Sequence, residues 1–164
     1  MAAPPEYSLK SLLGIRERAK EAAEKKLADT LAALKAEQER LRQLEEELAR
    51  MVARREAKAR EYAERAMRGE MSAQDAINSN VYLDRLKQQE DDQKNAIEAQ
   101  KAVIRQKEEE VEAARKELVD ATQELKAIEK HKEKWLEQLK KEEENKQDQA
   151  MDEIAQTIFL THDH

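Results

Sequence analysis

Apolar residues recur every seven positions along most of this chain, on both sides of one short break. A spacing of seven places an apolar stripe along an α-helix, and such a stripe needs a partner helix to cover it. In the first half the series is Leu27, Leu34, Leu41, Leu48, Arg55 and Tyr62, and a second series lies four residues further on, at Leu31, Gln38, Glu45, Val52, Ala59 and Ala66. The sequence therefore predicts an all-α coiled coil.

The second half keeps the same spacing over more turns. Its first series is Leu83, Glu90, Ile97, Ile104, Val111, Leu118, Leu125, Lys132 and Leu139; three residues on from these lie Leu86, Gln93, Gln100, Lys107, Ala114, Ala121, Ile128 and Trp135. A chain with 41% charged residues can also be disordered. Disorder has no reason to hold a phase over so many heptads, so we reject it. Before Leu27, the apolar positions Leu9, Leu12, Ala19 and Ala23 fit a shifted phase, which predicts a stutter.

The break RGEMSAQDAINSN (residues 68–80) predicts a turn between two helices. Gly69 suits the left-handed residue that ends a helix. Ser72 with Asp75 three residues later resembles a capping box for the next helix. We predict one antiparallel coiled-coil hairpin domain over residues 1–164, with helices over about 9–68 and 75–159 and a tip over 69–80. The alternatives are a kink in one continuous helix and a long parallel dimer.

The two series suggest how the arms face each other. If facing residue numbers add up to 145, the turn falls at Ser72–Ala73, and Leu34 faces Val111. Polar exceptions then coincide as well: Arg55 falls opposite Glu90, Glu45 opposite Gln100, and Gln38 opposite Lys107. In this register the second helix is the longer one and has no intramolecular partner after about Leu139. That overhang ends with apolar residues at near-helical spacing, Ile154, Ile158, Phe159 and Leu160, and an exposed apolar end implies a partner.

Catalytic and ligand-binding motifs are not found. The sequence has no glycine-rich phosphate loop, and its three histidines do not suggest a base or a metal site. His131 is expected to be solvated, and His162-Asp163-His164 lacks the third and fourth ligands of a structural zinc site. We therefore predict no enzyme activity, no cofactor and no metal. The net charge of −6, with both signs mixed, argues against nucleic acid. No apolar run reaches the roughly 20 residues that span a bilayer, and the absence of cysteine fits a reducing cytoplasm.

The order of segments resembles a known family. It comprises LKSLLGIRERAKEAAEKKL (residues 9–27), a first arm, a tip with Gly69, VYLDRL (81–86), a second arm, and the run HKEKWLEQLKKEEENKQDQAMDEIAQTIF (131–159). It is similar to the stalk proteins of bacterial type III export, flagellar FliJ and its injectisome counterparts of the YscO/SctO type. The resemblance implies a two-helix hairpin similar to the central stalk of rotary ATPases, in the bacterial cytoplasm at the inner-membrane export apparatus.

The resemblance also implies partners at both ends. The end with both termini is expected to enter the hexameric export ATPase, with contacts from Leu9, Leu12, Leu13, Ile154, Ile158 and Phe159. The tip is expected to contact the cytoplasmic ring of the export gate through Tyr62, Tyr82, Leu86, Gln89 and Gln93, although Gln89 and Gln93 depart from the residue types of the family. Some family members bind export chaperones. On its own the protein is expected to be a monomer.

Three other functions compete with a stalk. A homodimeric coiled-coil scaffold has the same periodicity. An export-chaperone-binding protein would need no contact with an ATPase. A prefoldin-like chaperone arm normally has strands beside its tip, and MSAQDAINSN (71–80) is not strand-like.

Overall fold

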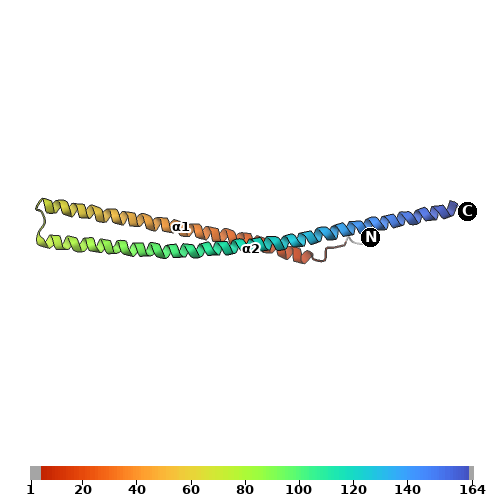
Figure 1. Ribbon diagram of the computed structural model, residues 1–164, viewed down its shortest axis with the longest axis horizontal. Helices are drawn as coiled ribbons and strands as arrows, with labels where there is room; N and C mark the ends of the chain where they lie inside the picture. The colour runs from red at the N-terminus through yellow and green to blue at the C-terminus, as the bar shows by residue number, and fades with distance from the viewer. Residues whose placement is uncertain (1–4, 163–164) are drawn as a thin grey trace. The chain divides into compact units, whose positions relative to one another are not determined.

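Two helices make up almost all of the computed structural model, which describes residues 5–162. Helix α1 spans Lys10–Met67 and α2 spans Ala73–His162, and no strand occurs within residues 5–162 (Figure 1). The predicted all-α class and the longer second helix are confirmed, and each helix boundary lies within three residues of its prediction, whereas residues 73–80 of the predicted tip belong to α2. By its contacts the chain divides into two compact units. The turn unit is residues 26–115, and the terminal unit is residues 1–25 with 116–164. One hairpin domain over the whole chain stays a prediction.

The turn between the helices has the chemistry that its sequence predicts. Gly69 has φ of 70°, in the left-handed region that closes a helix, and the Glu70 N–H donates to the Arg65 carbonyl at 2.9 Å. At the start of α2, the Asp75 N–H donates to Ser72 Oγ at 3.0 Å, and the Ser72 N–H donates to Asp75 Oδ2 at 3.1 Å. Both caps are confirmed.

In the turn unit, the seam, meaning the row of side chains through which the two helices pack, follows the prediction on α2. Its buried members are Leu86, Glu90, Ile97, Gln100, Ile104, Val111 and Ala114. On α1 the second predicted series is wrong at several of its positions, although Val52 and Ala59 are half-buried as predicted. Thr30, Glu37 and Leu44 are half-buried, three residues after the leucines, whereas Leu31, Gln38 and Glu45 are exposed.

The register of the turn unit differs from the predicted one by about one helical turn. Gln93 Nε2 donates to the Leu44 carbonyl at 3.0 Å, and Gln100 Nε2 donates to the Glu37 carbonyl at 3.0 Å. A helical carbonyl points toward the N–H four residues later. Gln93 and Gln100 therefore lie opposite residues near 48 and 41, and facing numbers add up to about 141. The predicted pairs Gln38–Lys107 and Glu45–Gln100 are therefore wrong. Leu34 likewise lies about one helical turn away from the position opposite Val111.

The pair Arg55–Glu90 is confirmed, with Nε and Oε2 2.5 Å apart, yet it does not mark facing backbone positions. Side chains on a helix lean toward its N-terminus, so these two long side chains lean toward each other across one turn. The loop between α1 and α2, residues 68–72, is centred two to three residues before the predicted turn at Ser72–Ala73. This shift agrees with facing residue numbers that add up to about 141 and not to 145.

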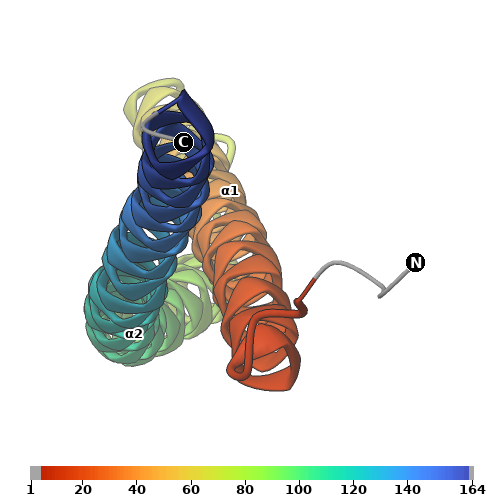
Figure 2. The same cartoon turned by 90° about the vertical axis from the view of Figure 1, so that its right-hand side faces the viewer.

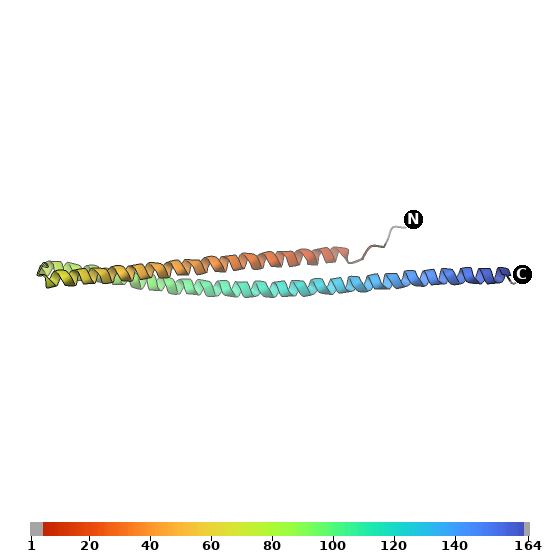
Figure 3. The ribbon, with the colours of Figure 1, turned by 90° about the horizontal axis from the view of Figure 1, so that it is seen from above.

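In the terminal unit, α1 is preceded by the non-helical residues 5–9 (Figure 2). Leu13, Arg16 and Lys20 are half-buried in the heptad phase of Leu27, but the four positions of the predicted shifted phase, Leu9, Leu12, Ala19 and Ala23, are buried or half-buried as well, so the stutter stays a prediction. Arg16 Nη1 pairs with Glu124 Oε2 of α2 at 2.6 Å. Helix α2 continues past the start of α1 (Figure 3), and all residues from Lys140 to His162 are exposed. The segment 140–162 is called the overhang.

Candidate functional site

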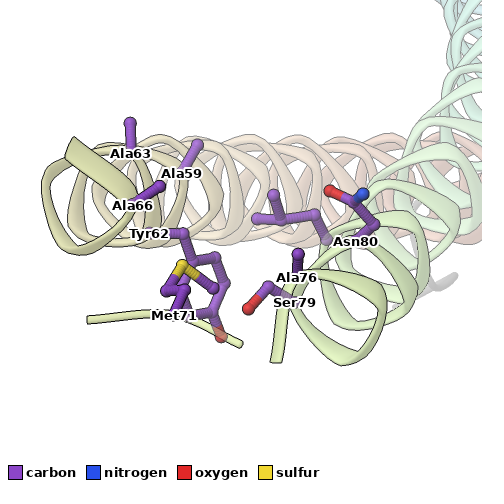
Figure 4. Close-up of a pocket in the computed structure, with 9 residues that line it drawn as sticks. Ala59, Tyr62, Ala63, Ala66, Met71, Ala76, Ser79 and Asn80 are labelled. Atoms are coloured by element: carbon purple, nitrogen blue, oxygen red, sulfur yellow. The ribbon is translucent and has the colours of Figure 1, made fainter. Parts of the chain in front are cut away.

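A groove opens between the helices beside the turn (Figure 4). Its volume is about 280 Å³, and its lining residues are Ala59, Tyr62, Ala63, Ala66, Met71, Ala76, Ser79, Asn80 and Leu83. The alanines leave space that larger side chains would fill. Tyr62 and Met71 lie together on one side of this space, with Ser79 on the other (Figure 4). Ser79 is held there because its hydroxyl donates to the Asp75 carbonyl at 2.8 Å.

The five predicted gate contacts have different environments in the turn unit. Leu86 is 6% exposed and belongs to the seam. Gln93 is half-buried and bonded to the Leu44 carbonyl, whereas Gln89 is exposed. Tyr62 and Tyr82 are both half-buried. The contact of these five residues with a gate stays a prediction.

Lys58 lies near the two tyrosines and is paired with Glu61. The pKa of Lys58 is raised above its ordinary value, first because its Nζ donates to Glu61 Oε2 at 3.1 Å. The charge of Glu61 and the hydroxyls of Tyr62 and Tyr82 act in the same direction. Lys58 therefore stays positively charged beside both tyrosines.

Sequence reasoning did not find the groove itself. Met71, Ser79 and Asn80 were assigned only to a turn, although Ala59, Ala63 and Ala66 recur at helical spacing on one face. A row of small residues that ends next to a predicted turn is the signal that could have found it.

The predicted ATPase contacts all lie in the terminal unit. Leu9, Leu12 and Leu13 are half-buried near the start of α1. Ile154, Ile158 and Phe159 are 55%, 54% and 66% exposed in the overhang. The structure thus leaves the overhang residues uncovered and the α1 residues partly covered.

Sequence reasoning missed an aromatic cluster in the same unit, formed by Tyr7, His131 and Trp135. Tyr7 is 6% exposed, and its hydroxyl lies 2.5 Å from His131 Nδ1. Its ring centroid is 5.7 Å from that of His131 and 5.3 Å from that of Trp135. His131 is exposed, as expected, and is also hydrogen-bonded to Tyr7, while the packing of Trp135 is confirmed. An aromatic residue just before a helix start, here Tyr7 before Lys10, is the signal that was available.

Within residues 5–162, no group of three or more His, Asp or Glu side chains is arranged to hold a metal ion. Asp163 and His164 of the predicted terminal cluster lie outside the described residues. No described helix combines the length and apolar character needed to cross a membrane.

Comparison with known proteins decides the family. The profile of the YscO-like proteins matches residues 4–164. The chain belongs to the YscO-like family. It is similar to the structure of CT670 from Chlamydia trachomatis, which is described as a YscO homolog, with 26% identity and a TM-score of 0.82. The match covers 97% of this chain and 98% of CT670. No curated protein matches the chain.

Membership in the YscO-like family makes this a type III secretion-associated protein. The family is a structural one that is not known for catalysis. Its members are associated with the type III secretion machinery, so the exposed surfaces at the turn and at the overhang are the places to look for contacts with that machinery.

Proposed function

We propose that this YscO-like protein is the central stalk of a bacterial type III export apparatus. The terminal unit inserts into the hexameric export ATPase, and the turn unit contacts the cytoplasmic ring of the export gate. The protein works in the bacterial cytoplasm, peripheral to the inner-membrane export apparatus, and is a monomer before it assembles.

The exposed overhang is the observation that best supports this proposal. Residues 140–162 continue α2 as an exposed, charged helix, and Ile154, Ile158 and Phe159 are exposed near its end. A protein surface that covers these apolar side chains would stabilise this helix. The inner wall of a ring of ATPase subunits is such a surface. The half-buried Leu9, Leu12 and Leu13 lie in the same unit and would support the contact from α1.

The groove beside the turn supports the second contact. It offers an apolar floor with Tyr62 and Met71, and the half-buried Tyr82 lies near Lys58 in the same unit. A ring of ATPase subunits around one asymmetric helix pair gives each subunit a different contact. The nucleotide state of the ring can therefore bias the stalk, and the stalk can bias the ring, because such coupling is reciprocal.

The first test removes residues 151–164. We expect the deletion to abolish stimulation or oligomerisation of the cognate ATPase, because it removes the apolar end of the overhang. Helix content measured by circular dichroism should fall only by the share of the residues removed, since the overhang stabilises no other element. Unchanged ATPase behaviour would refute the stalk, and would favour a homodimeric scaffold or a chaperone-binding protein.

The second test separates the two units. Tyr82→Ala should weaken binding to the purified gate ring and leave binding to the ATPase unchanged, and Val81→Ala is a matched control because Val81 is 55% exposed and next in sequence. If Tyr82→Ala weakened both interactions equally, the division of contacts between the two units would be wrong.

A further inference from the structure

The last turns of the overhang present one apolar face. Successive helical residues are rotated by about 100°, so the apolar side chains here fall within an arc of roughly 140°. These are Met151, Ile154, Ala155, Ile158 and Phe159. On one side of this arc, the Thr157 hydroxyl donates to the Glu153 carbonyl at 2.9 Å, and the Thr161 hydroxyl donates to the Thr157 carbonyl at 2.7 Å. Both hydroxyls are satisfied within the helix, so the threonines can border an apolar partner without an unpaired polar group.

The other side of this face is acidic. Asp148 and Asp152 are one turn apart and lie on the same side of the helix as Phe159. Residues 147–162 contain no Lys or Arg. Among the ion pairs of the described chain, neither aspartate has a partner, whereas Glu39 and Glu46 both pair with Arg42. The two carboxylates therefore add an uncompensated negative charge beside the apolar face.

The apolar face does not continue the seam of the terminal unit. The heptad spacing of Trp135 and Leu139 leads to Glu142, Lys146, Gln149, Glu153 and Gln156, all of which are polar and exposed, and only then to the exposed Leu160. The apolar face is turned by about 160° from this row. An extension of the seam therefore does not cover it. A second copy that paired the same segment, residues 147–162, would bring no positive side chain to the acidic side, because this segment contains no Lys or Arg.

We propose that the overhang binds as an amphipathic helix in an apolar groove of the export ATPase, and that the rim of this groove beside Phe159 carries Lys or Arg side chains that pair with Asp148 and Asp152. Ile154, Ile158 and Phe159 are the anchors, in the i, i+4, i+5 pattern of a helix that presents one face to a groove. This inference rests on the proposed function and adds the charge of the partner surface. The aspartates steer the helix into place and set its rotation about its own axis.

The experiment measures the dissociation constant of the full-length protein for the purified cognate ATPase at 50 and 500 mM NaCl. The apolar variant is Phe159→Ala, with Leu160→Ala as its control, because Leu160 is 63% exposed but lies on the opposite side of the helix. The charge variant is Asp148→Lys with Asp152→Lys. Its control is Glu142→Lys with Glu153→Lys, which changes the charge equally on the polar side of the overhang. Circular dichroism verifies that each variant keeps its helix content.

We expect Phe159→Ala to weaken binding by about tenfold or more, as for an interface anchor, and Leu160→Ala by less than about twofold. The double aspartate reversal should weaken binding about tenfold at 50 mM NaCl and less than about threefold at 500 mM, because salt screens a rim interaction. The control reversal should have a much smaller effect at both salt concentrations.

Two outcomes would overturn the basic rim. One is unchanged binding of the aspartate reversal, and the other is an equal loss in the control reversal, which would indicate only a response to net charge. If Phe159→Ala and the deletion of residues 151–164 still abolish binding, the stalk proposal survives without the basic rim. If the deletion leaves binding intact, both proposals fail.

Discussion

Arg55 of α1 and Glu90 of α2 form an ion pair inside the seam of the turn unit. Arg55 Nε and Glu90 Oε2 are 2.5 Å apart, and the Glu90 side chain is 4% exposed while that of Arg55 is 31% exposed. The hydrogen bond from Arg55 to Glu90 raises the pKa of Arg55 above its ordinary value, so the guanidinium stays charged. A carboxylate this deeply buried depends on that single cation, because burying a charge without its partner is costly.

Removing the cation should therefore harm the protein more than removing both charges. We expect Arg55→Ala to lower the midpoint of thermal unfolding by roughly 5 °C, because Glu90 is left buried and unpaired. The double variant Arg55→Met with Glu90→Leu should recover most of this loss. Circular dichroism at 222 nm measures the midpoints. A double variant no more stable than Arg55→Ala would show that the unpaired charge is not the cause.

A pair of engineered cysteines distinguishes the two registers. The natural chain has no cysteine, so each disulfide can be assigned to its pair. With facing numbers near 141, cysteines at Leu44 and Ile97 lie opposite each other and should form an intramolecular disulfide, whereas cysteines at Leu48 and Ile97 lie about one turn apart and should not. Non-reducing gel electrophoresis and peptide mapping give the result. A crosslink between two chains would contradict the antiparallel hairpin.

The two glycines should respond in opposite directions to the same substitution. Gly69 has φ of 70°, and a Cβ there meets no atom within 4 Å, so Gly69→Ala should destabilise by about 1 kcal/mol through backbone strain alone. Gly14 lies within α1, and a Cβ there would meet only the flexible Arg18 side chain, at 3.4 Å. Gly14→Ala should stabilise by about 0.5–1 kcal/mol because alanine favours the helix. Urea unfolding measures both. Unchanged stability of Gly69→Ala would contradict backbone strain at the cap, and destabilisation by Gly14→Ala would contradict the helix-propensity argument.

The cap of α2 predicts a dependence on pH. The pKa of Asp75 is lowered from its ordinary value of 3.8, first because the Ser72 N–H donates to its carboxylate and then because of the Ser72 hydroxyl. A lowered pKa in the folded state gives a stabilisation that is fully present above the unfolded pKa and is lost as the pH falls through the folded value.

The stability difference between the wild type and Asp75→Asn should therefore be constant above about pH 5 and shrink below about pH 3.8. Urea titrations from pH 7 to 2.5 measure it. Asp148→Asn, which changes an exposed aspartate of the overhang, is the control. A difference that grew on acidification would contradict the assigned direction of the pKa shift.

The aromatic cluster of the terminal unit can be followed through Trp135, the only tryptophan in the chain. Tyr7→Ala should shift the emission maximum of Trp135 to longer wavelength and increase its quenching by acrylamide, because the Tyr7 ring covers the indole. Tyr7→Phe keeps the ring and loses only the hydrogen bond to His131, so its emission should stay close to that of the wild type. Equal changes in both variants would assign the effect to the hydrogen bond.

The sequence predicted α2 better than α1 for a physical reason. Every predicted heptad position of α2 is buried or half-buried, because Ile97, Ile104 and Val111 mark one stripe clearly. On α1 the observed second series contains Thr30, Glu37 and Lys58. Their side chains end in polar groups, so the sequence does not mark them as seam residues, although the aliphatic parts of such side chains can pack there. Because Leu31 and Val52 are apolar, the prediction placed the second series one residue further along α1, at the positions of these two residues.

The sites were predictable only in part. The exposed overhang followed from the difference in helix length and from Ile154 and Ile158. The groove beside the turn depends on how the alanines of both helices meet, which a register error of one turn obscures. The Tyr7 cluster joins residues 124 positions apart, and no periodicity connects the non-helical leader to α2.

The overhang has a consequence for how tightly the protein can hold a partner. Residues 140–162 keep their helix by local hydrogen bonds alone, and a lone helix of that length is only marginally stable in water. Its amides should exchange with solvent far faster than those around Ile104. A partner that binds this segment must therefore offset the conformational entropy that the segment loses when it is held as a helix. Its affinity is lower, and its dissociation faster, than the same contacts would give with a rigid helix.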